Sequence, residues 1–333
     1  MNETLRYRLV LTALCVLVLA LFLASLTIGP AAIGFSASLK ALFSRDGGAI
    51  MLIMQQVRLP RAILGLMIGA TLGLSGAVLQ GYLRNPLAEP GLLGISSSAS
   101  LGAVIAIYTG LSAAFALALP LMALVFALGA VIIVRGLAGG GLQSLTVILA
   151  GVAVTAFAGA MTSLALNLSP NPFAAMEIMF WMLGSLADRS MLQVYVAAPF
   201  MLAGWLILFS TGRGLNAMML GGDAAASLGH DPKRLINRVM WGTAASVGAA
   251  TAVSGAIGFV GLVVPHLLRP LVGSVPARLL PASALGGAAM LLSADIAVRL
   301  VAPDRDLKIG VVTALVGAPF FLWLIFKTRR SLL

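Results

Sequence analysis

The most constraining feature of this 333-residue sequence is its long stretches without a charged residue. Residues 90–134 contain no Asp, Glu, Lys or Arg, and residues 9–39 and 239–268 are equally free of charge. Only 9% of the chain is charged and 60% is hydrophobic, whereas a soluble domain carries about 25% charged residues. A soluble protein of this size cannot cover its surface with so few charges. The sequence therefore predicts a polytopic membrane protein.

Two other classes are excluded by composition. The formal net charge is +11, but no dense run of basic residues is present, so nucleic-acid binding is a poor interpretation. The single cysteine, Cys15, lies inside an apolar stretch and excludes a disulfide scaffold.

The charge-free stretches predict an all-α fold of about ten transmembrane helices, because one crossing takes ~20 apolar residues. We expect two spans within 90–134, divided near Thr109-Gly110, and two within 239–268, divided near Ser254-Gly255. The remaining predicted spans are residues 9–28, 62–83, 142–166, 190–212, 279–294 and 309–326. Residues 173–186 are apolar but short and predict a half-helix packed inside the protein. Residues 1–333 thus form one transmembrane domain, and the 37 glycines predict close helix packing.

The distribution of Lys and Arg predicts the orientation. With the N-terminus inside and ten spans, 13 of the 21 basic residues fall on the cytoplasmic side and 8 on the outer side. Both termini are therefore expected in the cytoplasm.

Several basic residues are expected at the outer ends of spans. Arg58-Leu59-Pro60-Arg61 precedes one span, and Arg299 ends another on the same face. Such arginines commonly anchor helices at the headgroups; alternatively they face outward and dock an acidic partner. Asp295 lies four residues before Arg299, which predicts a helical ion pair rather than a proton relay.

Two cytoplasmic segments carry further signals. Residues 84–91 form a short turn that contains Asn85 and two prolines. The longest polar stretch, about 213–238, contains residues 222–229, which predict a short capped helix. This segment is either a plain loop or a helix presented to a cytoplasmic partner that drives conformational change.

The sequence offers no catalytic chemistry. It has no phosphate-binding loop, no paired catalytic acids and no clustered metal ligands, since His230 and His266 stand apart. We therefore expect no catalytic residue, no metal site and no cofactor in this chain. If ATP drives this protein, a separate chain binds it.

Taken together, the motifs resemble the FecCD family of permeases, the transmembrane subunits of type II ABC importers for iron chelates, haem and cobalamin. The matching segments occur in order along nearly the whole chain: residues 58–61, 69–80, 84–91, 149–152, 181–185, 228–229, 255–269, 294–299, 310–314 and 317–319. Two positions depart from the family pattern. Gly222-Asp223 stands where two acids are common, and Lys308 replaces a proline.

The resemblance implies the type II importer permease fold and a homodimer in a bacterial inner membrane. Two ATP-binding cassette subunits, which hold ATP and Mg, would dock inside, and one periplasmic substrate-binding protein outside. It also assigns roles to residues. The docking residues would be Arg58, Arg61 and Arg299, and the cytoplasmic gate Asn85, Leu87, Ser144 and Leu145. The ATPase-coupling helix would contain Gly222, Asp223, Ala224, Ala225, Ser227, Leu228 and Gly229.

The resulting hypothesis is a non-enzymatic permease subunit of an ATP-driven importer that moves an iron chelate, a ferric siderophore or haem, by alternating access. A cobalamin permease of the same family stays open as the alternative. An ion-gradient-driven carrier would need more intramembrane acids than Glu177 and Asp295. An intramembrane enzyme would need paired catalytic residues at membrane depth.

Overall fold

The computed structural model describes residues 3–29, 31, 33–45, 47–115, 117–139, 144–169, 172–302 and 307–330, and within these ranges it contains helices and no strand. The first half comprises α1 (Glu3–Thr27), α2 (Phe35–Phe43), α3 (Ala49–Leu52), the π-helical η1 (Ile53–Arg58), α4 (Leu59–Leu83), the short η2 (Pro90–Leu93), α5 (Ile95–Tyr108), α6 (Leu111–Ala114) and α7 (Ala118–Ala138). The second half comprises α8 (Ser144–Asn167), α9 (Pro172–Met182), α10 (Met191–Phe209), α11 (Gly212–Met218), α12 (Gly222–Ser227), α13 (Pro232–Ser254), α14 (Val260–Val272), α15 (Pro276–Val301) and α16 (Ile309–Arg330).

The helices account for the predicted spans. Six of the described helices are long and apolar enough to cross a membrane: α1, the continuous helix Ala49–Leu83, α7, α8, α10 and α15. Four shorter helices, α5, α9, α14 and α16, are also apolar, and the 23-residue α13 contains the predicted span that begins at residue 239. Both predicted breaks are confirmed, because α5 ends at Tyr108 and α13 ends at Ser254.

The helix α9 differs from the prediction of a half-helix packed inside the protein. Ile178 and Trp181 are buried, but Phe173 is 83% exposed and Phe180 50% exposed. Because α9 has only 11 residues and one packed stripe, most of its apolar side chains lie on the surface of this chain.

The helix α4 lies at the centre of the bundle and packs against α15, α14, α13 and α10. Glycines allow these contacts. A Cβ added at Gly69 would lie 2.4 Å from the Gly287 carbonyl oxygen, and one at Gly76 would lie 1.9 Å from that of Gly261. Neither position has room for a side chain, so the predicted close packing through small residues is confirmed for α4 against α15 and α14.

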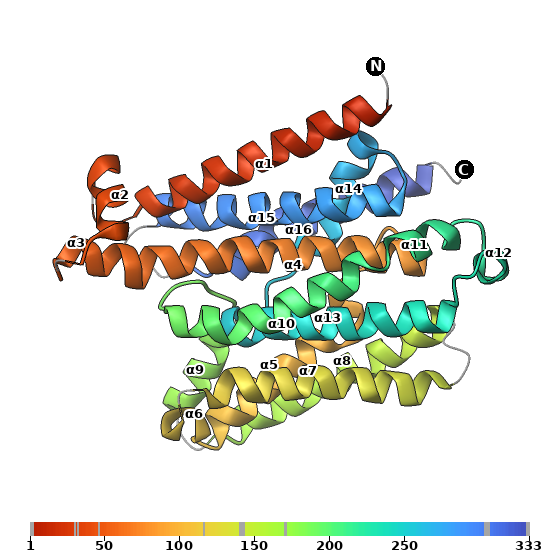
Figure 1. The fold of residues 1–333 in the computed structure, drawn as a ribbon. Coiled ribbons are helices and arrows are strands. Elements are labelled where there is room, and N and C mark those ends of the chain that lie inside the picture. The colour runs from red at the N-terminus through yellow and green to blue at the C-terminus, as the bar shows by residue number, and fades with distance from the viewer. Residues whose placement is uncertain are drawn as a thin grey trace.

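The helices run side by side between two ends (Figure 1). The α12 end carries α12, the start of α1 and the end of α16, and the α2 end carries α2 and α3. At the α12 end, Arg6 donates to the Pro270 carbonyl oxygen at 2.6 Å and Arg278 pairs with Glu3 at 3.5 Å. These contacts attach the start of α1 to the end of α14 and the start of α15.

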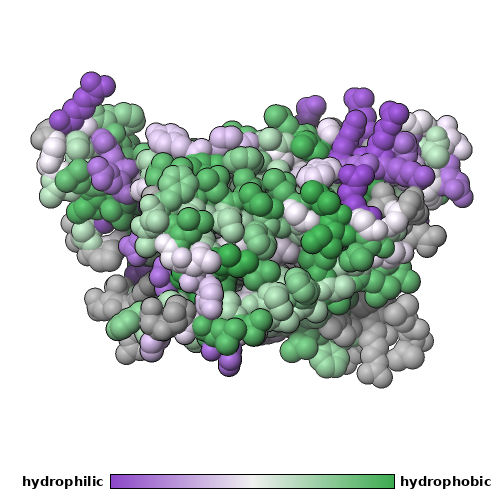
Figure 2. Space-filling model, turned by 90° about the horizontal axis from the view of Figure 1, so that it is seen from below, coloured by the Kyte–Doolittle hydropathy of each residue, from purple (hydrophilic) through white to green (hydrophobic). Residues whose placement is uncertain are grey.

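Much of the surface between the two ends is apolar (Figure 2). Large exposed side chains lie on helices widely separated in the chain, for example Leu19 on α1, Phe157 on α8 and Leu206 on α10. Hydrophobic surface on this scale is excluded for a soluble monomer and is suited to lipid.

Candidate functional site

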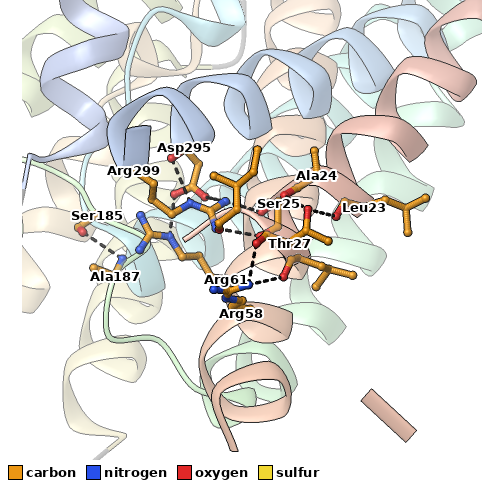
Figure 3. A network of polar contacts seen from close by, with 12 residues as sticks. Leu23, Ala24, Ser25, Thr27, Arg58, Arg61, Ser185, Ala187, Asp295 and Arg299 are labelled. Carbon is orange, nitrogen blue, oxygen red and sulfur yellow. Dashed lines mark hydrogen bonds and ion pairs between the residues drawn. The ribbon is translucent and has the colours of Figure 1, made fainter. Parts of the chain in front are cut away.

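The α2 end contains a buried cluster of charges, shown in Figure 3. Asp295 on α15 is 1% exposed and accepts from two arginines. Arg61 donates from Nε at 2.8 Å, and Arg299, one turn further along α15, donates from a terminal nitrogen at 2.7 Å. The predicted ion pair between Asp295 and Arg299 is confirmed, and Arg61 of α4 joins it.

Two of the arginines also donate hydrogen bonds to the backbone carbonyl oxygens at the C-terminal end of α1. Arg58 donates to the carbonyl oxygens of Leu26 at 3.1 Å and Thr27 at 2.8 Å. Arg299 donates to the carbonyl oxygens of Ser25 at 2.8 Å and Ile28 at 2.6 Å. The last four carbonyls of a helix have no partner within it and form the negative end of its dipole. The guanidinium groups supply both the missing donors and the opposite charge.

The alternative in which the arginines face outward does not describe the side chains of Arg58 and Arg299 in the structure. Arg58 is 4% exposed and Arg299 is 8% exposed, and both are held by α1 carbonyls. The side chain of Arg61 is 18% exposed and keeps some access to the surface. Sequence reasoning missed the inward direction because α1 ends about 30 residues before Arg58, and no local pattern marks that contact. Docking of a partner by the three arginines stays a prediction.

The turn that contains the predicted gate residues Asn85 and Leu87 begins directly after α4. Arg84 adopts a left-handed conformation, with φ of 49°, and ends the helix. The Asn85 side-chain oxygen then accepts from the Leu87 backbone N–H at 2.9 Å, a turn that asparagine commonly forms. Both gate residues are half-buried. The structure therefore gives this segment a fixed local shape.

The other predicted gate residues begin α8. Ser144 is its first residue, and its side chain lies outside the described part of the structure. Leu145 is 67% exposed. Further along, a Cβ at Gly151 of α8 would lie 1.9 Å from the Leu92 carbonyl oxygen. The segment after the Asn85 turn therefore packs directly against the α8 backbone two turns beyond Leu145.

A buried polar link next to the turn was not singled out as a site from the sequence. Gln80 of α4 donates to the carbonyl oxygens of Gly261 and Leu262, each at 3.3 Å, and accepts from Arg269 at 2.9 Å. These contacts attach the first turn of α14 to α4. Gln80 and Arg269 stood among the motif matches, but their contact over 189 positions has no local signal.

The predicted short helix at the α12 end is present as α12. Gly221 precedes it with φ of 119°, and Gly229 follows it with φ of 82°. The His230 N–H donates to the Ala225 carbonyl oxygen at 2.9 Å and closes the helix. Ala225 is fully buried, and Asp223 and Ser227 are exposed.

Apolar side chains surround α12 on the surface. Leu228 is 60% exposed, Leu220 72% and Met219 54%. A short helix that carries one exposed carboxylate and is flanked by exposed leucine and methionine side chains is suited to docking in a cleft of another protein. Among the described residues, no group of three His, Cys, Asp or Glu side chains is placed to hold a metal ion.

Comparison with known proteins gives one consistent family. The FecCD transport family matches residues 17–327. The haemin transport system permease protein HmuU of Yersinia pestis is 35% identical over 344 aligned residues, which cover 99% of both chains. The vitamin B12 import system permease protein BtuC of Vibrio cholerae is 41% identical and covers 84% of both chains. An uncharacterised ABC transporter permease, YvrB of Bacillus subtilis, is 39% identical over 84% of this chain and 80% of its own length.

A solved structure agrees with this result. The inward-facing conformation of a putative metal-chelate type ABC transporter superposes with a TM-score of 0.85. It is 33% identical and covers 95% of this chain and 98% of the solved chain. The helical bundle, the apolar surface between its ends and these comparisons agree: the chain is a multi-pass membrane protein with the type II ABC importer permease fold, and it belongs to the FecCD transport family of ABC transporter permeases.

Proposed function

We propose that this chain is the permease subunit of a binding-protein-dependent importer that moves an iron chelate, a ferric siderophore or haem, across a bacterial inner membrane. The observation that carries the proposal is the similarity to the haemin permease, which extends over 99% of both chains. The likeness to a solved metal-chelate transporter supports the same substrate class.

The proposed assembly is a homodimer with two ATP-binding cassette subunits and one substrate-binding protein. The exposed helix α12 supports an ATPase docking at the α12 end, because α11 and α13 pack against one side of it and its other side is exposed. The residues proposed for this contact are Gly222, Asp223, Ala224, Ala225, Ser227, Leu228 and Gly229. Closure of the ATPases would push α12 and tilt the spans attached to it.

The same geometry sets the proposed orientation. The ATPases work in the cytoplasm, so the α12 end, with the start of α1 and the end of α16, is the cytoplasmic end. The α2 end then faces the periplasm, where Arg61 is the best placed of the three arginines to meet an acidic binding protein. The gate proposed near Asn85, Leu87, Ser144 and Leu145 would close the path on the cytoplasmic side.

Cobalamin is the second candidate substrate, and the 41% identity to the vitamin B12 permease of Vibrio cholerae favours it. An ion-gradient-driven carrier is less well supported. Asp295, one of its two candidate intramembrane acids, is held by two arginines at 2.7 and 2.8 Å and is poorly placed to carry a proton.

The test is ATP hydrolysis by this chain purified with its candidate ATPase. Candidate binding proteins are added empty or loaded with haem, a ferric siderophore or cobalamin. We expect stimulation by one binding protein loaded with an iron chelate. Stimulation by the cobalamin-loaded protein alone would replace the iron chelate with cobalamin, and the absence of any stimulation would overturn the importer assignment.

A further inference from the structure

An open cavity of about 480 Å³ lies at the α12 end, between the last turns of α7 and the first turns of α13. Arg135, Gly136 and Gly139 line it from α7 and the residue that follows it, and Lys233, Asn237 and Trp241 line it from α13. None of these residues belongs to the coupling helix or to the proposed gate. The cavity therefore has no role in the function proposed above.

The side chains of Arg135 and Lys233 make the charge in this cavity positive. Neither Arg135 nor Lys233 forms an ion pair with an acidic group in the part of the chain that the structure describes. Lys233, Arg234 and Arg238 all lie in the first two turns of α13, where the helix dipole is positive and cations are unfavourable. Asp231 caps α13 by accepting from the Lys233 backbone N–H, and its carboxylate pairs with the Arg234 side chain rather than with that of Lys233.

A neutral acceptor stands beside the two cations. The Asn237 side-chain oxygen is buried and finds no hydrogen-bond partner among the described residues. A buried acceptor without a donor is energetically unfavourable. A ligand that carries a hydroxyl or ammonium group next to its negative charge would satisfy Asn237 and the two cations together.

The apolar surface next to the cavity indicates which class of ligand it binds. Ile132 also lines it and is 62% exposed, and the neighbouring Ile133 is 53% exposed, so an apolar surface continues from the cavity along α7. Tryptophan is characteristic of membrane interfaces, and Trp241 lies on the cavity wall. Figure 2 shows hydrophilic side chains gathered at the α12 end next to a broad hydrophobic surface.

We infer that this cavity binds the headgroup of an anionic phospholipid, with the phosphate between Arg135 and Lys233, a headgroup hydroxyl on Asn237, and the acyl chains along the exposed face of α7. Basic pockets between transmembrane helices at the cytoplasmic surface bind anionic headgroups in this way. Phosphatidylglycerol fits the site because its glycerol hydroxyls are donors. Phosphatidylcholine does not, because choline offers no N–H or O–H group.

The glycines provide a steric test that leaves the charges in place. A Cβ added at Gly136 would meet nothing within 4 Å, so Gly136→Leu fills the cavity from a helical position that tolerates a side chain. Gly136→Leu leaves Arg135 and Lys233 unchanged, so a general attraction between basic residues and anionic membranes would persist in this variant. Loss of lipid from it would therefore indicate a defined binding site.

The experiment measures lipids retained by the full chain, in nanodiscs that contain phosphatidylglycerol or phosphatidylcholine, by native mass spectrometry. We expect selective retention of phosphatidylglycerol, and a loss of about 30-fold in its affinity when Arg135→Gln and Lys233→Gln are combined. Gly136→Leu should lower retention as well. Lys40→Gln with Arg45→Gln, which removes two charges at the α2 end, is the matched control and should retain the lipid.

Three results would overturn the inference. The first is equal loss of lipid in the α2-end control. The second is displacement of the lipid by millimolar inorganic phosphate, which would make the cavity a site for the free ion. The third comes from the unmodified chain: a photoactivatable phosphatidylglycerol should label residues 132–139 or 233–241, and labelling spread evenly over the chain would contradict a defined site.

Discussion

The two ends of the bundle use arginine in opposite ways. At the α2 end, Arg58 and Arg299 are buried, and their guanidinium groups bind α1 carbonyl oxygens and Asp295. At the α12 end, the side chain of Arg234 is 85% exposed and makes one ion pair of 3.5 Å with Asp231. The sequence places arginines near span ends in both cases, so the difference arises from the partners that the fold supplies.

The difference indicates how much the charges at each end contribute to the stability of the fold. A buried guanidinium is tolerated only when several acceptors surround it, and the end of α1 provides them, which joins α1, α4 and α15. At the α12 end, Arg6 and Arg278 attach the start of α1, but the exposed pair of Arg234 with Asp231 lies within the start of α13 and joins no two helices. The stability of the protein should therefore depend strongly on the buried charges of the α2 end and weakly on the exposed Arg234–Asp231 pair of the α12 end.

The largest loss of folding stability is expected for Asp295→Ala. It leaves Arg61 and Arg299 without their carboxylate in a buried setting, which typically costs about 3–5 kcal/mol. Thermal unfolding of the purified chain in detergent measures the loss, and the exposed Asp223→Ala is the matched control. Equal unfolding temperatures for the two variants would show that the buried cluster contributes no stability.

A smaller loss is expected for Arg58→Gln. The carbonyl oxygens of Leu26 and Thr27 lose their donor, at a cost of about 1–3 kcal/mol. The stability measurement is paired with binding-protein docking at low and high salt. We expect lower stability with a retained salt dependence of docking, whereas unchanged stability with weakened docking would make Arg58 a displayed docking residue.

A different outcome is expected for Asp223→Lys in α12. Its charge meets the positive end of a short helix, so the stability cost should stay below about 1 kcal/mol. ATP hydrolysis should nevertheless uncouple from transport, because this side chain lies on the face proposed for the ATPase. Lys40→Gln at the α2 end, an exposed position far from α12, is the control, and normal transport by Asp223→Lys would refute the assignment of α12 as the coupling helix.

The smallest change in folding stability is expected for Arg234→Gln. The pair with Asp231 is exposed, and such pairs contribute roughly 0–1 kcal/mol. Thermal unfolding should match the unmodified chain within error. A decrease as large as that of Arg58→Gln would remove the contrast between the two ends.

Much of the fold is readable from the sequence because charges mark where spans end. The predicted span 62–83 corresponds to α4, Leu59–Leu83, and the breaks at Thr109-Gly110 and Ser254-Gly255 are where the helices end. The position of α12 was predictable too, because its flanking glycines mark a capped helix. These features depend on neighbouring residues, which the sequence displays.

The features that could not be predicted depend on contacts between distant segments. Whether Arg58 turns inward is decided by the end of α1, and the cavity beside Lys233 exists only because the end of α7 lies next to it. The exposed stripe of α9 is a further example, because its composition does not reveal which side finds a partner. Local patterns predict helices, whereas tertiary packing decides what each charge contacts.

The most direct test of the central claim is uptake of a radiolabelled iron chelate into proteoliposomes that contain this chain with its ATPase. The loaded binding protein is placed on the side of the α2 end, and ATP on the side of the α12 end. We predict uptake that requires ATP and persists when ionophores collapse all ion gradients. Uptake that proceeds without the ATPase and stops with the ionophores would contradict the account and establish a gradient-driven carrier.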